Sequence, residues 1–71
     1  MNKNTKKRLL KIIEEMDGTF LASSVREKFI QNFGTRVPNN NQIALFLRLH
    51  CDVVGMFESR QVYERRVIYA N

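Results

Sequence analysis

The chain has 71 residues and a formal net charge of +5, so we expect one small basic domain with no apolar residues to spare for a large catalytic cleft. Its sequence pI of about 9.9 favours an anionic partner such as nucleic acid, although basic surfaces also serve solubility alone. One cysteine excludes an intramolecular disulfide, and no apolar run approaches the roughly 18 residues that span a bilayer, so we expect an intracellular, cytoplasmic protein without membrane contact.

The first predicted element is a helix over residues 5–16. Its apolar residues recur at i, i+3, i+4 and i+7, the spacing of one buried face: Leu9, Ile12, Ile13 and Met16. Thr5 can cap its start, and Gly18 can end it in the left-handed conformation. Lysines and an arginine crowd its first turns against the helix dipole. This placement fits a charge needed for a partner, and it equally fits a solvated chain end.

A strand over residues 19–21 and a second helix follow. Ser24 and Glu27 match a capping box, and Ser23 could cap one residue earlier. The helix is predicted to end at Gly34 and to bury Val25, Phe29, Ile30 and Phe33. A loop over residues 35–38 comes next, because the residue before Pro38 avoids helical angles.

The third predicted helix runs from Pro38 or Asn39 to about His50 and is crowded with side-chain amides in its first turn. Ile43, Phe46 and Leu47 form its core stripe, and its far side is predicted to hold Asn40, Asn41, Ala44 and Arg48. Asn and Arg pair with base edges when the start of a helix lies in the major groove. Several Asn after a Pro can also simply form a turn and an N-cap, and both interpretations stay open here.

The C-terminal segment predicts a β-hairpin, with strands over residues 53–57 and 62–69 and a polar turn over residues 58–61. The predicted fold class is therefore α+β, with the hairpin packed on three helices. The expected core comprises Leu9, Ile12, Ile13, Phe20, Val25, Phe29, Phe33, Ile43, Phe46, Leu47, Val54 and Val67.

This order of elements resembles the winged-helix branch of the helix-turn-helix superfamily over residues 5–69. The resemblance is carried by the strand at Phe20 before a Ser-capped helix, by the turn at residues 34–38, by the Leu-Arg-x-His phrase at 47–50 and by Arg60 near the tip of the hairpin. It implies a single winged-helix domain over residues 1–71, in which the third helix reads the major groove and the hairpin is the wing.

Site residues and partners follow from the resemblance. It implies that base edges and phosphates are contacted by Lys6, Lys7, Arg36, Asn40, Asn41, Ala44, Arg48, Arg60, Arg65 and Arg66. The partner is then double-stranded DNA, and the expected function is transcription regulation as a cytoplasmic, nucleoid-associated protein. A homodimer is expected, because one reading helix covers few base pairs. Glu58 and Glu64 depart from the pattern and would weaken the wing as a DNA contact.

Other binding roles stay open. Winged helices also serve as protein-interaction modules. Leu45 and Leu49, on the flank of the third helix, either close the edge of the core or form a dimer or partner patch. An RNA-associated accessory role needs exposed aromatic side chains, and only Phe57, Tyr63 and Tyr69 on the hairpin could be free.

The residue pattern argues against an enzyme. His50, Cys51 and Asp52 are the residue types of a cysteine-nucleophile triad, but consecutive side chains diverge, and His50 is expected to be buried or bonded to backbone. One Cys and one His are too few for a structural zinc site, and the scattered glycines form no phosphate loop. We expect no catalytic residue, metal, cofactor or small-molecule substrate.

Overall fold

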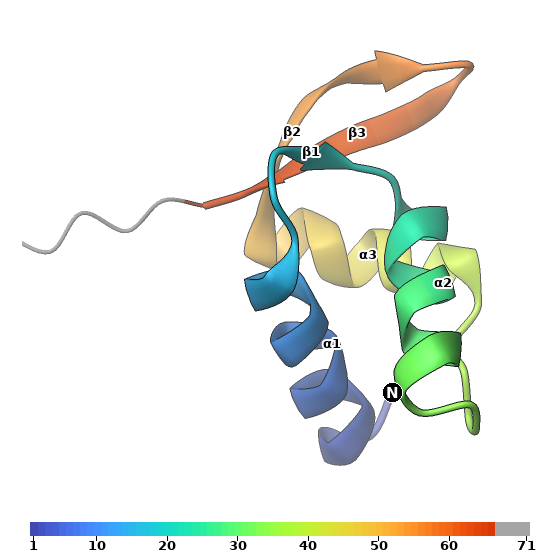
Figure 1. The fold of residues 1–71 in the computed structure, drawn as a ribbon. Coiled ribbons are helices and arrows are strands. Elements are labelled where there is room, and N and C mark those ends of the chain that lie inside the picture. The colour runs from blue at the N-terminus through green and yellow to red at the C-terminus, as the bar shows by residue number, and fades with distance from the viewer. Residues whose placement is uncertain (67–71) are drawn as a thin grey trace, which may run out of the picture.

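The computed structural model describes residues 1–66. Its elements, in chain order, are α1 (Lys3–Glu15), β1 (Thr19–Phe20), α2 (Ala22–Asn32), α3 (Asn40–His50), β2 (Cys51–Phe57) and β3 (Arg60–Arg65). Over these residues the strands form an antiparallel sheet in the order β1-β3-β2, and Figure 1 shows this sheet lying across one end of the helices. The predicted α+β fold is confirmed. Over the same residues, no helix is both long and apolar enough to cross a bilayer.

The sheet joins segments that are far apart in the chain. β1 pairs with β3 through Thr19 with Glu64 and Phe20 with Tyr63, and β2 pairs with β3 as a hairpin. Glu58 and Ser59 have φ angles of 47° and 65°, as both central residues of a type I′ hairpin turn require. The hairpin strands therefore begin earlier than predicted, and residues 67–69 of the second predicted strand lie outside the described residues.

Two predicted helix caps are wrong. Asn2, not Thr5, caps α1: its Oδ1 accepts a hydrogen bond from the backbone nitrogen of Thr5 at 2.8 Å. α2 begins at Ala22 with Leu21 as an N-cap that makes no side-chain hydrogen bond, so the capping box predicted at Ser24 does not form. The reason is the sheet: β1 ends at Phe20, and the chain turns into the helix immediately after it.

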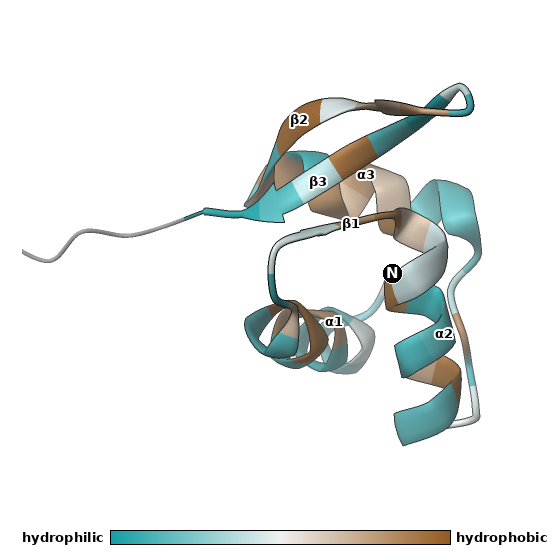
Figure 2. Cartoon of the chain, turned by 45° about the horizontal axis from the view of Figure 1, so that its top comes forward, coloured by the Kyte–Doolittle hydropathy of each residue, from teal (hydrophilic) through white to brown (hydrophobic). Residues whose placement is uncertain are grey.

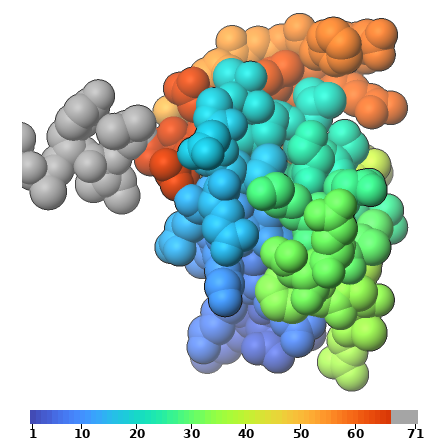
Figure 3. Space-filling model, viewed as in Figure 1, coloured from blue at the N-terminus to red at the C-terminus, as the bar shows by residue number. Residues whose placement is uncertain are grey.

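The buried core lies where the helices meet the sheet. The predicted members Leu9, Ile12, Ile13, Phe20, Val25, Phe29, Ile43, Phe46 and Leu47 are confirmed, and Phe33 packs against them half-buried. Val54 and Ile30 were predicted to be buried, and both predictions are wrong, because these side chains are 49% and 42% exposed. Val67 lies outside the described residues. Figure 3 shows α1 and α2 in close contact beneath the hairpin.

Tyr63 is a core residue, although the sequence suggested that it could be a free aromatic side chain on the hairpin. The side chain is 1% exposed, its ring stacks on Phe20 with a centroid separation of 6.5 Å, and its hydroxyl donates to Gln61 Oε1 at 2.9 Å. The prediction failed because β3 is the central strand and therefore packs on the helices, whereas β2 lies at the sheet edge. Figure 2 shows that the edge strand β2 carries strongly apolar segments.

Candidate functional site

The amide-rich start of α3 divides into two capping residues and two free ones. Asn39 is the N-cap: its Oδ1 accepts from the backbone nitrogen of Gln42 at 2.8 Å, and Gln42 Oε1 accepts from the backbone nitrogen of Asn39 at 3.1 Å. Asn40 and Asn41 are exposed, and within residues 1–66 neither side chain takes part in this capping box. Capping therefore explains the first pair of amides and leaves the second pair available for a ligand.

A cleft of about 320 Å³ lies between the start of α2, the start of α3 and the hairpin; we call it the α3–hairpin cleft. Asn40, Asn41 and Ala44 line it from α3. Ser59, Arg60 and Gln61 line it from the hairpin, and Ser23 lines it from α2. Among the described lining residues, Arg60 carries a charge and no residue is acidic. Leu21, Ala22 and Tyr63 line it too, so the cleft is mixed polar and apolar and weakly cationic.

The groups around the α3–hairpin cleft are rich in hydrogen-bond donors. Gln61 Oε1 already accepts from the Tyr63 hydroxyl, so the amide nitrogen of Gln61 is its remaining polar end. The start of α2 has no side-chain cap. The backbone nitrogens of Ser24 and Val25 donate to the backbone oxygen of Leu21, which leaves those of Ala22 and Ser23 without a side-chain acceptor. Guanidinium, amide and N–H donors without a carboxylate suit a phosphate or the edge of a base.

The sequence did not predict three polar lining residues, Ser23, Ser59 and Gln61. Alternation along β3 places Gln61 on the same face as Tyr63, so a correct assignment of Tyr63 to the core would have found it. No local signal places Ser23 or Ser59 there, because the cleft forms only when α2 and the hairpin turn come together.

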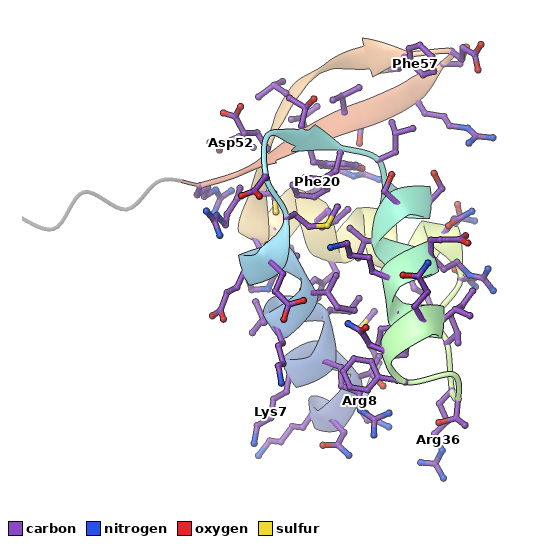
Figure 4. The ribbon with its side chains drawn as sticks, in the orientation of Figure 1. Lys7, Arg8, Phe20, Arg36, Asp52 and Phe57 are labelled. Atoms are coloured by element: carbon purple, nitrogen blue, oxygen red, sulfur yellow. The ribbon has the colours of Figure 1, made fainter. Side chains whose placement is uncertain are left out.

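The other predicted contact residues divide between α3 and the far end of the molecule. Arg48 is exposed one turn beyond Ala44, on the same side of α3. Lys6 lies at a different groove, which Leu45 and Leu49 of α3 also line. Lys7 and Arg36 lie at the end of the helices opposite the hairpin, whose tip carries Phe57 (Figure 4).

Arg65 and Arg66 hold helix ends in place. Arg65 Nη1 donates to the backbone oxygen of Glu14 at the end of α1. Arg66 Nε lies 3.2 Å from Asp52 Oδ1, and its Nη1 donates to the backbone oxygen of Leu49 at 3.1 Å. Cations that bond the last carbonyls of a helix stabilise its C-terminus. Among the described residues, neither arginine lines the α3–hairpin cleft.

The exposed side of α3 also carries apolar side chains. Leu45 and Leu49 are 58% and 70% exposed, so the interpretation that they close the edge of the core is wrong. A groove of about 240 Å³ runs beside them between α3 and the start of α1, and Lys6 lines it too. His50 was predicted to be buried or bonded to backbone; it is exposed, with its ring 4.3 Å from that of Phe46, so the first of these two alternatives is wrong.

The residues suggestive of catalysis, His50, Cys51 and Asp52, lie where α3 passes directly into β2. Cys51 is 1% exposed, and this burial raises the pKa of its thiol. The positive charge of Arg66 opposes the rise in pKa, and the negative charge of Asp52 adds to it. A thiol with a raised pKa is a weak nucleophile. Within residues 1–66, no three His, Cys, Asp or Glu side chains lie close enough together to hold a metal ion.

Comparison of the chain with protein-family models, with curated proteins and with solved structures finds no match.

Proposed function

We propose that this protein is a winged-helix transcription regulator that binds double-stranded DNA on the nucleoid. The observation that carries the proposal is the α3–hairpin cleft, where the amides of Asn40 and Asn41 lie opposite Arg60 and no carboxylate within residues 1–66 lines the cleft. The element order and the strand order β1-β3-β2 support the winged helix, with the hairpin as the wing. The net charge of +5 supports a polyanionic partner.

The contacts divide by position along α3. Asn41 and Arg48 are exposed on the side away from the core and would meet base edges in the major groove. Arg60 would meet the backbone from the wing, and Lys6 would meet it from the start of α1. Glu58 at the wing tip limits how closely that tip can approach a phosphate.

The test is binding to a random-sequence duplex at increasing salt, followed by selection of bound sequences from a random pool. The logarithm of the association constant should fall by about 0.9 per neutralised phosphate for each tenfold rise in salt. Asn41→Ala and Arg48→Ala should each cost about 1–3 kcal/mol on the selected site and relax base preference there. Absence of binding at low salt would contradict the proposal.

A protein-interaction module is the second candidate, favoured by the exposure of Leu45 and Leu49 on α3. Binding through leucines should barely respond to salt, whereas DNA binding should weaken steeply. The RNA-associated role has less support, because Tyr63 is buried and Tyr69 lies outside the described residues. Of the three aromatic residues predicted to be able to stack on bases, Phe57 is exposed within residues 1–66.

A homodimer completes the proposal, with the free edge of β2 as its interface. Within residues 1–66, β2 pairs with β3 alone, and Val53, Val54, Met56 and Phe57 on it are 45–64% exposed. A second copy fits this edge because residues 53–57 carry no charge, so two chains of net charge +5 can meet there without opposing like charges. Tyr63 on the neighbouring strand β3 is buried and takes no part in this surface.

A further inference from the structure

The face of α3 that points furthest from the core mixes polar and apolar side chains. Asn41, Leu45 and Arg48 are spaced i, i+4 and i+7, so they lie on one face of the helix. All of them are exposed, and Ile43 and Leu47 on the opposite face are fully buried. Leu45 therefore stands between an amide and a guanidinium, with 58% of its side chain exposed.

The surroundings of Leu45 combine apolar, polar and cationic side chains. α3 contains no Asp or Glu from Asn40 to His50. Lys6 and Gln42 line the groove beside Leu45 together with the apolar side chains of Met1, Phe46 and Leu49, and Arg48 follows Leu45 one turn later on α3. An apolar side chain framed by cations fits a partner that is apolar at one point and anionic around it.

We propose that Leu45 contacts the C5-methyl group of thymine in the major groove and so makes α3 selective for thymine. The inference rests on the proposed function. That methyl is the apolar group on the base-pair edges in the major groove, and phosphates border it on both strands. Along α3, Leu45 lies between Asn41 and Arg48. We therefore expect the thymine that Leu45 contacts to lie beside the bases that Asn41 and Arg48 contact.

The experiment compares duplexes that differ only in the methyl group. One pair is alternating A·T against alternating A·U, because deoxyuridine lacks the methyl. The other pair is alternating G·C with and without 5-methylcytosine, which adds a methyl at the corresponding position. Wild-type protein should bind the methylated member of each pair about fourfold more tightly, the factor expected for burial of one methyl-sized group.

Variants assign the effect to Leu45. Leu45→Ala should bind the members of each pair equally, and Leu45→Met should keep the preference because it keeps an apolar side chain of similar volume. Ala is a strong helix former and the site is exposed, so the helix should persist, as circular dichroism would verify. Ile30→Ala is the matched control, because Ile30 is 42% exposed on α2. It should leave the methyl preference unchanged.

The outcomes separate the inference from the proposed function. Binding that is salt-sensitive but equal for both members of each pair would overturn the role of Leu45 and leave DNA binding in place. No binding to any of the four duplexes at low salt would overturn both. A methyl preference that persists in Leu45→Ala would also overturn the inference. So would a fall from dimer to monomer in light scattering on Leu45→Ala, because Leu45 would then belong to an interface between copies.

Discussion

Asn39 and Gln42 each accept a hydrogen bond from the other's backbone nitrogen, at 2.8 and 3.1 Å, and so close the first turn of α3. This reciprocal pair stabilises the start of the helix that lines the α3–hairpin cleft. It also separates two roles within a run of chemically identical residues, because Asn40 and Asn41 contribute nothing to the capping box.

Asn39→Ala should therefore lower the free energy of unfolding by about 1 kcal/mol, the usual effect of losing an N-cap. Asn40→Ala should leave stability within about 0.5 kcal/mol of wild type, because its side chain is exposed, and should weaken DNA binding instead. Urea unfolding and duplex titration of both variants measure the two effects. Equal losses of stability would show that capping is not confined to Asn39.

Arg60→Ala and Lys7→Ala remove the same charge from different places. Arg60 lines the α3–hairpin cleft, and Lys7 lies at the opposite end of the molecule (Figure 4). Arg60→Ala should lower the salt slope of DNA binding by about one and weaken all sequences alike. Lys7→Ala should change the slope much less. If the two variants behaved alike, the net charge rather than the cleft would direct binding.

Tyr63→Ala and Val54→Ala test the corrected core. Tyr63 is 1% exposed, and removal of a large buried aromatic ring costs about 3–5 kcal/mol, most of the stability available to so small a domain. Val54 is 49% exposed, so its truncation should change stability by less than about 0.5 kcal/mol. Circular dichroism during thermal unfolding distinguishes the two. A folded Tyr63→Ala with unchanged melting temperature would exclude Tyr63 as a core residue.

Burial of Cys51 should make stability fall in alkaline solution. Because burial raises the pKa of the thiol above its ordinary value of 9.0, the folded state favours the neutral form. The free energy of unfolding is then unaffected below pH 9.0 and decreases as the pH rises above it, where the unfolded thiol ionises first. Cys51→Ala is the control, since other groups also titrate there. The wild type should lose more stability than this variant between neutral and alkaline pH.

Val54→Lys should convert the proposed dimer into a monomer. The substitution places a charge in the middle of the uncharged β2 edge, where a second copy would meet it. Its side chain is exposed, so the monomer should keep its fold. Light scattering should give the wild type about twice the 8.4 kDa of one chain and the variant a mass near that of one chain. A wild-type mass near 8.4 kDa would refute the dimer.

Features whose signals are local could be predicted from the order of residues. Apolar residues repeating every three or four positions identified the buried faces of α1 and α3, such as Leu9, Ile12 and Ile43, because a helix buries whatever recurs at its own period. The α+β class followed from the order of helical and strand-forming segments. The capping potential of the amides before α3 was visible too, although which Asn would cap and which would remain free was not.

The identity of the central strand and the set of residues that meet across the cleft depend on contacts between distant segments of the chain. Phe20 pairs with Tyr63 from the far end of the chain, and this pairing buries Tyr63, leaves Val54 at the edge and sets where α2 begins. No local pattern encodes such a partner, because strand register depends on contacts between distant segments. The same holds for charge: Arg60 joins Asn40 and Asn41, but Arg65 and Arg66 bind helix ends, because the fold and not the composition determines which cations remain free.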